Sequence, residues 1–421
     1  MAADPIAAGT YRVSPEVEEI YAKLAACEQV TKGLAFLQAD EEKTLGDQKE
    51  ISEIPSPPFK EEVRAAYYRK RLEALGLKEV TTDGEGNVFG VYKGSGGGPK
   101  LFIAAHLDTV FPEGTDLTVT TKEGRLYGPG IADDARGLAA ILSIVRALNA
   151  AGVKPVGDIV FGGTVGEEGL GDLRGVKAFF REHEDIDGFI TVDGTKVSLI
   201  TYLATGSFRY EITYRGPGGH SFNAFGTPSP IHALGRAIAK IAEVRTPAEP
   251  KTTFTVGVVS GGTSVNSIAF EASMLLDLRS NRQEELQKLE DTVLPLLTAA
   301  AAEENARWNS EAITVEVKKV GDRPAGEQSP QTPMVQAAWA AALALGEKGE
   351  LSPASSTDAN LPISLGIPAL RLAGGGTEGA NHSLGEWFDP TKAYLGPQKV
   401  FLTILGLVGV SGVSQPLLPK R

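Results

Sequence analysis

Cysteine is nearly absent from this chain, since Cys27 is the only one in 421 residues. A disulfide framework and a thiolate metal cluster are therefore excluded, and any metal ion would be bound by His, Asp and Glu. Positive charge is also scarce, with 41 Lys and Arg against 53 Asp and Glu and a net charge of -12. This balance disfavours a nucleic acid or an anionic membrane as the main partner, because both require a positive surface.

Long apolar runs are missing as well. The longest, FLTILGLVGV at 401–410, is too short to span a bilayer and predicts a buried helix. The opening MAADPIAAGTYRV has no basic segment followed by an apolar stretch, which argues against a secretion signal. We therefore expect a cytoplasmic protein.

The length exceeds the size at which single hydrophobic cores stop growing, so two domains are expected. Apolar strands alternate with helices through the first half of the chain, which predicts an α/β fold whose mostly parallel central sheet is flanked by helices. The segments are a helix in 54–76, a hairpin in 80–94, a strand in 100–110, a helix in 135–152 and strands in 158–165 and 188–194.

The pattern changes near residue 206. From there to about 319 the order is strand, helix, strand, strand, helix, strand, which is typical of a small α+β layer with four antiparallel strands and one open sheet face. The main fold resumes near VGDRPAG. We therefore predict a discontinuous catalytic domain of residues 1–205 and 320–421 that carries an inserted domain of residues 206–319.

Ligands of open α/β sheets bind outside the carboxyl ends of the strands, so the residues at those ends are the candidates. The first strand ends in His106-Leu107-Asp108, where Asp108 shares a face with His106 and could orient its ring. A histidine whose hydrogen bonds are simply satisfied is the alternative. In GPGIADDARG, Asp134 could cap the following helix and leave Asp133 to face the crevice.

Further acids follow the next two strands. Glu167 and Glu168 lie in GGTVGEEGLG, where a solvated turn is the alternative, and Asp193 in TVDG could equally be a turn residue. His382 lies in the Gly-rich GGGTEGANHS. His183, in a charged run, is expected to be solvated, and His232 is expected to be a surface or packing residue of a helix.

Two histidines with several carboxylates suit zinc or a similar divalent ion. The number of candidate ligands matches two ions. Asp133 would bridge them, His106 and Asp193 would hold one, and Glu168 and His382 would hold the other. Glu167 would then act beside them as the general base, which gives the two adjacent glutamates separate tasks.

The order of the motifs HLDTV, GPGIADDARG, GTVGEEGLGD, TVDG and GGGTEGANHS resembles the dizinc metallopeptidases that include peptidase T, glutamate carboxypeptidase, aminoacylase and acetylornithine deacetylase. The resemblance begins near residue 50. It implies the same ligands, with Asp108 orienting His106 and Glu167 as base, and Asp at position 193 looks closest to the peptidase T branch. Arg136 departs from the family, where Lys is frequent near that point.

The inserted segment resembles the lid domain of this family, which commonly mediates dimerisation. RGPGGHSF resembles the motif whose histidine steadies the oxyanion in a neighbouring subunit's site, which implies that role for His220. The segment 261–280 implies substrate binding by Asn266 and Arg279, and an arginine fork suits a substrate carboxylate. A salt bridge within the lid is the alternative for Arg279. Arg323 and Asn360 are further candidates for the substrate pocket.

The sequence thus predicts a metal-dependent hydrolase, with two Zn2+ per subunit or Co2+ or Mn2+ in their place. Its expected substrates are short peptides, cleaved by an exopeptidase of the di- or tripeptidase and aminopeptidase type, and its expected state is a homodimer formed through the lid. Deacylation of N-acyl amino acids or carboxypeptidase action within the same family is the alternative. A non-catalytic binding protein would have lost the base or a ligand, and a structural zinc site would be closed and mononuclear.

Overall fold

A six-stranded sheet forms the centre of the first structural unit in the computed structural model, which describes residues 11–421. The strand order is β1-β2-β6-β3-β7-β16. The four strands from β6 to β16 are parallel, while β1 and β2 are antiparallel additions at one edge. The strands are β1 (Lys78–Thr82), β2 (Val88–Tyr92), β3 (Lys100–His106), β6 (Asp158–Thr164), β7 (Gly188–Val192) and β16 (Ala369–Leu372).

Helices cover this sheet on both faces. Alternate side chains of the central strand β3 point to opposite faces, and both sets are buried. Ile103 packs in the large core that α5 and α11 share, whereas Phe102 stacks on Phe179 of α6 with ring centroids 4.0 Å apart. The helices of the unit are α1 (Pro15–Ala26), α2 (Glu28–Ala39), α3 (Glu41–Ser52), α4 (Glu62–Ala74), α5 (Ala135–Ala151), α6 (Arg174–Glu182), α9 (Pro333–Ala344), α10 (Asn360–Ser364) and α11 (Leu395–Val408).

A smaller antiparallel sheet joins two loops that are distant in sequence. Its order is β17-β18-β5-β4, and it pairs Trp387 with Tyr127, which brings the segment around His382 beside the loop that leads to Asp133. These strands are β4 (Thr120–Lys122), β5 (Arg125–Tyr127), β17 (Thr377–Gly379) and β18 (Trp387–Asp389). A short parallel pair, β8 (Leu199–Ile200) with β15 (Glu350–Leu351), lies elsewhere in the unit.

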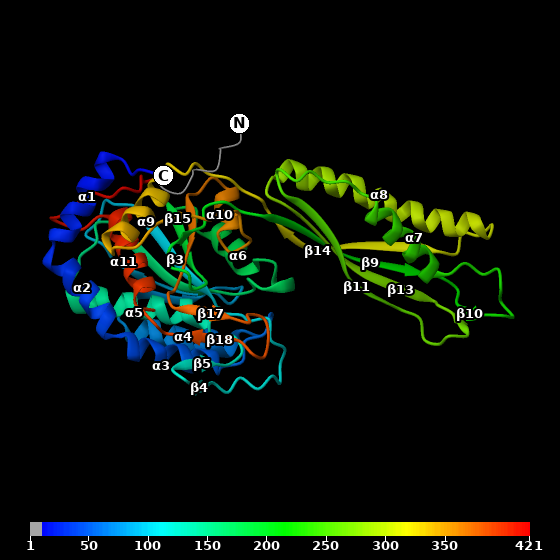
Figure 1. The fold of residues 1–421 in the computed structure, drawn as a ribbon, viewed down its shortest axis with the longest axis horizontal. Coiled ribbons are helices and arrows are strands. Elements are labelled where there is room, and N and C mark those ends of the chain that lie inside the picture. The colour runs from blue at the N-terminus through cyan, green and yellow to red at the C-terminus, as the bar shows by residue number, and fades with distance from the viewer. Residues whose placement is uncertain (1–10) are drawn as a thin grey trace. The chain divides into compact units, whose positions relative to one another are not determined.

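The second unit, Ala204–Gly326, is a four-stranded antiparallel sheet with two helices on one face (Figure 1). Its strand order is β11-β13-β9-β14. Every second residue of β9, from Phe208 to Tyr214, is buried in the core that α7 and α8 contribute to. The elements are β9 (Gly206–Arg215), β10 (Gly219–His220), α7 (Pro230–Ala242), β11 (Thr252–Gly261), β12 (Ser267–Ile268), β13 (Glu271–Ser280), α8 (Gln283–Arg307) and β14 (Thr314–Arg323).

The predicted fold class is confirmed, including the inserted four-stranded sheet. The expected end of the insertion at residue 319 falls inside β14, which continues to Arg323. The apolar run 401–410 lies largely within α11, which is buried as predicted. Within residues 11–421, no helix combines the length and the apolar character needed to cross a bilayer.

Candidate metal centre

Four of the five predicted metal ligands converge at the carboxyl ends of the parallel strands. The Nε2 atom of His106, the last residue of β3, lies 2.9 Å from Oδ1 of Asp133. The Nε2 atom of His382 lies 3.0 Å from both Asp133 Oδ2 and Glu168 Oε1. One ligand atom each from His106, Asp133 and Glu168 falls within a 4.8 Å group. Asp133 therefore lies between two histidines, each facing a different oxygen of its carboxylate.

Asp108 connects two of the predicted motifs. Its carboxylate is fully buried and accepts the backbone N–H groups of Glu167 and Glu168, at 3.0 and 2.8 Å. The Nδ1 atom of His106 lies 3.5 Å from its carboxylate but only 2.9 Å from its backbone oxygen. Asp108 thus orients the histidine mainly through its main chain, while its side chain fixes the loop that carries the two glutamates.

The loop before α5 gives its two adjacent aspartates different environments. Asp134 caps the helix by accepting the N–H of Gly137 at 3.1 Å, which confirms its predicted role, and it also accepts the N–H of His106. Position 137 must be glycine, because a Cβ there would lie 2.1 Å from the backbone oxygen of Val192. Asp133 consequently faces the histidines while its neighbour secures the helix end.

Asp193, the fifth predicted ligand, follows β7 and pairs with an arginine that the sequence analysis did not single out. The Nε atom of Arg371 lies 3.0 Å from Asp193 Oδ2, and its Nη2 lies 3.3 Å from Oδ1. This is the two-point geometry in which a guanidinium binds a carboxylate. Arg371 stands on β16, one strand away, and its partner could not be read from the spacing of either residue in the sequence.

Hydrogen bonding between the histidines and carboxylates sets the electrostatics of this cluster. Burial alone would lower the pKa of His106, but the neighbouring Asp108 and Asp133 outweigh it and raise that pKa well above its usual value. Hydrogen bonds with Asp133 and Glu168 raise the pKa of His382 to about 10. Burial opposes ionisation of Asp133, yet the two histidines lower its pKa. The carboxylates therefore stabilise a neighbouring positive charge, and a divalent cation could supply that charge in place of the histidine protons.

Two buried residues hold the metal-site loops, and sequence reasoning missed both roles. Glu386 is fully buried and accepts the backbone N–H groups of Gly130, Ala132 and Asp133, at 3.1, 2.9 and 3.2 Å. Burial raises the pKa of its carboxyl to about 7. Arg136 is also fully buried and donates to the backbone oxygens of Gly374 and Ala393, besides pairing with Glu41. The only available signal for Glu386 was an acid four residues after His382.

The predicted substrate residues of the second unit gather in two places. His220 and Asn266 lie in the paired segments around β10 and β12, where the backbone oxygen of Asn266 accepts the N–H of Ser221 at 2.9 Å. Arg279 pairs with Asp277 at 2.6 Å, so the salt bridge considered for it does form. Arg323 is buried on β14. In the first unit, Asn360 is buried and its Oδ1 accepts the N–H of Thr357.

The other two histidines make contacts outside the predicted metal site. His232 is exposed and lies 3.5 Å from Glu304, in line with a surface role. His183 is not simply solvated as predicted, because its ring packs against Phe179 and Phe89 and is half-buried. Because His183 lies in a charged run of the sequence, its contact with Phe179, one turn earlier on α6, was not predicted.

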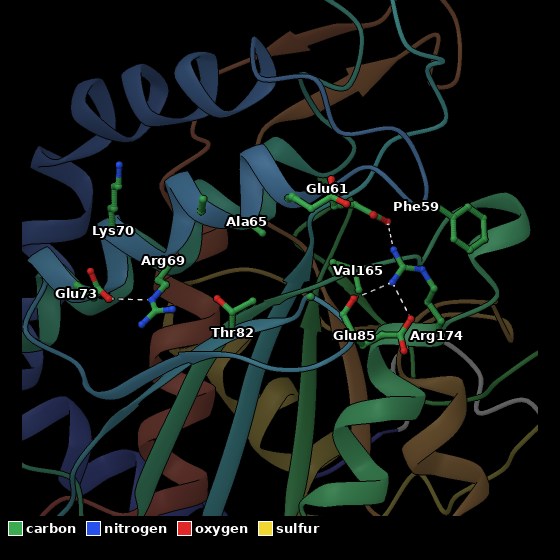
Figure 2. A pocket seen from close by; sticks show the side chains of 13 residues that line it. Phe59, Glu61, Ala65, Arg69, Lys70, Glu73, Thr82, Glu85, Val165 and Arg174 are labelled. Carbon is green, nitrogen blue, oxygen red and sulfur yellow. Dashed lines mark hydrogen bonds and ion pairs between the residues drawn. The ribbon is translucent and has the colours of Figure 1, made fainter.

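A separate pocket of about 440 Å3 lies between α4 and the β1–β2 hairpin (Figure 2). Arg174 reaches across it to Glu61 and Glu85, at 2.6 and 2.9 Å. Its lining includes Val165, two residues before Glu167, but none of the predicted metal ligands. This pocket is therefore distinct from the cluster of histidines and carboxylates.

The donor set fits divalent cations, since imidazole nitrogens and carboxylate oxygens face one another at hydrogen-bonding distances without a thiol among them. The sequence from residue 102 to 405 matches the model of peptidase family M20/M25/M40. The chain belongs to this family. The predicted family and enzyme class are thereby confirmed.

Individual relatives are distant. The uncharacterized protein YqjE of Bacillus subtilis (strain 168) is 27% identical over 351 residues, which cover 80% of this chain and 91% of the relative. A succinyl-diaminopimelate desuccinylase of Nitrosospira multiformis is 28% identical over 230 residues, or 50% of this chain and 61% of the relative. The crystal structure of aminopeptidase PepT from Bacillus cereus shares the fold, with a TM-score of 0.70, 24% identity and coverage of 86% of this chain and 98% of that one.

Proposed function

We propose that this family member is a two-zinc exopeptidase that hydrolyses short peptides, with a free amino terminus as the end it recognises. The observation that carries the proposal is the position of Asp133, which offers one carboxylate oxygen to His106 and the other to His382. A carboxylate shared in this way is what two neighbouring cations require. The choice of peptides over other amides rests on the likeness to the aminopeptidase PepT.

In this proposal His106 and Asp193 would hold one ion, Glu168 and His382 the other, and Asp133 both. Bound divalent ions would polarise the scissile carbonyl and acidify the attacking water, and Co2+ or Mn2+ could serve in place of zinc. Glu168 is fixed for this task by the hydrogen bond from its N–H to Asp108.

Glu167 is proposed as the general base. It would accept the proton of the attacking water and later donate it to the leaving amine. Its side chain is largely buried, and its N–H is anchored on Asp108 at 3.0 Å, so its backbone is held at the edge of the cluster. The adjacent Glu168 points its carboxylate at His382, which is the division of tasks that two neighbouring glutamates permit.

The second unit is proposed to bind the substrate. Arg209 and Arg279 share the carboxylate of Asp277, at 3.1 and 2.6 Å. Burial and the charges of Arg323 and Arg279 lower the pKa of Arg209. A peptide carboxylate would be attracted to this group of arginines, because a guanidinium binds a carboxylate at two points. We assign Arg279, Arg323, Asn266 and Asn360 to substrate binding and His220 to the oxyanion.

A homodimer formed through the second unit is part of the proposal. Its edge strand β11 is ten residues long and leaves Val258 and Val259 exposed by 52% and 57%. An unpaired apolar edge of this length tends to be covered by another chain. Light scattering on the purified protein would give twice the chain mass. A cytoplasmic location stays a prediction.

The deciding experiment compares Glu167→Gln with the wild type on four substrate sets: free di- and tripeptides, the same peptides N-acetylated, the same peptides C-amidated, and N-acyl amino acids. We expect cleavage of free peptides, loss on N-acetylation, and a fall in kcat of at least ~100-fold in the variant with its metal content retained. Near-normal turnover by Glu167→Gln would remove it as the base.

The second candidate is deacylation of N-acyl amino acids, which the desuccinylase relative favours. Under that function the N-acyl amino acids would be cleaved and the free peptides would not. Carboxypeptidase action would instead tolerate N-acetylation. C-amidation should reduce cleavage under either peptidase function, because the Arg279 group is proposed to bind the peptide carboxylate.

A further inference from the structure

The pair formed by Arg371 and Asp193 places a permanent positive charge against a proposed metal ligand. Both hydrogen bonds of the guanidinium fork reach Asp193, at 3.0 and 3.3 Å, and both side chains are mostly shielded, with 24% and 15% exposure. An arginine cannot release its proton in a protein, so its charge stays when a cation arrives. Carboxylates that bind metal ions are ordinarily held by hydrogen bonds from neighbouring groups, and here the donor carries a full positive charge.

The position of Arg371 is built into the fold. Its backbone is held on both sides, in parallel register with Thr191 of β7 and in an isolated bridge with Thr201 that has hydrogen bonds of 2.9 and 3.2 Å. Its side chain lies over Gly194, where a Cβ would come within 2.2 Å of Nη2. Gly194 has a φ of +77°, so the residue after the ligand is suited to glycine for two reasons. The guanidinium therefore has little freedom to leave Asp193.

Several carboxylates surround Arg371, and its positive charge stabilises them when no metal is bound. Asp193, Glu378 and Asp133 all act on its guanidinium electrostatically. One carboxyl oxygen of Glu378, Oε2, is buried without a hydrogen bond. Removing Arg371 would leave these carboxylates facing one another in a shielded environment, which is costly.

A bound metal ion would have to share Asp193 with Arg371. A carboxylate has about four lone-pair directions, of which the guanidinium fork occupies two, so Asp193 can still serve an ion. The ion would then share its ligand with a neighbouring positive charge, and the repulsion between them lowers its affinity. The fork also orients Asp193, and this orientation would raise the affinity for the ion. Because repulsion between charges does not need exact alignment, we expect it to outweigh the gain from orientation.

We propose that Arg371 is a resident counter-cation of the metal centre: it stabilises the metal-free site and weakens the binding of the ion that Asp193 helps to hold. Arg371 is a positioning residue in this account, because it acts through Asp193. The inference rests on the two-metal centre proposed above.

The test measures zinc binding to metal-stripped protein by competition with a chromophoric chelator, in Arg371→Met, Arg371→Lys and the wild type. Arg371→Met removes the charge, and Arg371→Lys keeps the charge but loses the fork. We expect one of the two zinc ions to bind ~10-fold more tightly to Arg371→Met and within about threefold of wild type to Arg371→Lys. Arg371→Met should also melt at a lower temperature than wild type when metal-free, and this deficit should shrink with zinc.

Arg69→Met is the control, since Arg69 also pairs with one carboxylate, Glu73, at 2.9 Å, but lies on α4 and not on a strand that carries a ligand loop. Its zinc affinities should equal those of wild type. If Arg371→Met does not fold, Arg371→Gln removes the charge with a smaller change of shape, and the same tightening is expected.

Two results would overturn the inference: weaker zinc binding in both Arg371→Met and Arg371→Lys, which would make the fork an orienting device, or unchanged binding in Arg371→Met. A wild-type stoichiometry of one zinc would instead refute the two-metal centre. The order of affinities among the variants for that single ion would still decide the role of Arg371.

Discussion

The substitution Asp108→Asn tests how the metal loops are held together. The buried Asp108 carboxylate accepts two backbone N–H groups, from Glu167 and Glu168, one on each oxygen. Asparagine offers a single acceptor oxygen, so one of these N–H groups would face an NH2 group. A hydrogen bond to a charged acceptor contributes about 1.5–3 kcal/mol, and a buried unpaired N–H costs about 1–3 kcal/mol. We therefore expect metal-free protein to lose about 2–4 kcal/mol of unfolding free energy.

The same substitution should weaken zinc binding, because the Asp108 carboxylate holds the N–H of Glu168, whereas the backbone oxygen that faces His106 is unchanged. Loss of a partner behind a metal ligand typically reduces affinity about 10–100-fold. Urea unfolding gives the first quantity and chelator competition the second. Asp116→Asn is the control, since Asp116 accepts one backbone N–H in an exposed turn. If Asp108→Asn matched this control in both assays, the linking role of Asp108 would be refuted.

Two further predictions concern stability away from the ligands. Burial lowers the pKa of Lys399 to about 7, so between pH 7 and 10 the unfolded chain binds a proton that the folded chain lacks. The free energy of unfolding should therefore rise with pH, by up to about 1.4 kcal/mol per pH unit relative to Lys399→Met. Parallel pH profiles of the two proteins would contradict this. Phe102→Ala should cost about 3–5 kcal/mol, because Phe102 is fully buried on Phe179 between sheet and helix, and a loss below about 1 kcal/mol in urea unfolding would show that the aromatic contact is dispensable.

The residues that could be predicted from the sequence are those whose setting is local. His106 ends β3 and Glu168 follows β6, two parallel strands whose carboxyl ends meet at one edge, and Asp133 precedes α5. His382 lies between β17 and β18 of the small antiparallel sheet and was singled out by its Gly-rich motif. The capping role of Asp134 is equally local, since it depends on the N–H of Gly137 three residues later. Strand and helix patterns therefore sufficed to place most of the candidate centre.

The residues that escaped prediction act through partners far away in the sequence. Arg371 meets Asp193 across 178 positions, and Glu386 meets the Gly130–Asp133 loop across more than 250. Neither contact has a periodicity or a motif of its own, because the partners are brought together only when β16 pairs with β7 and β18 with β5. Asp108 illustrates the intermediate case. Its proximity to His106 was predicted from a strand continuing through 100–110, but β3 ends at His106, and its hydrogen bonds to the Glu167 loop required the fold.

The most direct test of the central claim is anomalous diffraction at the zinc edge from crystals of the zinc-loaded protein. The account predicts two peaks that share Asp133, one beside His106 and Asp193 and the other beside Glu168 and His382. A single peak, or zinc bound away from Asp133, would contradict the two-metal centre on which the proposed peptidase rests.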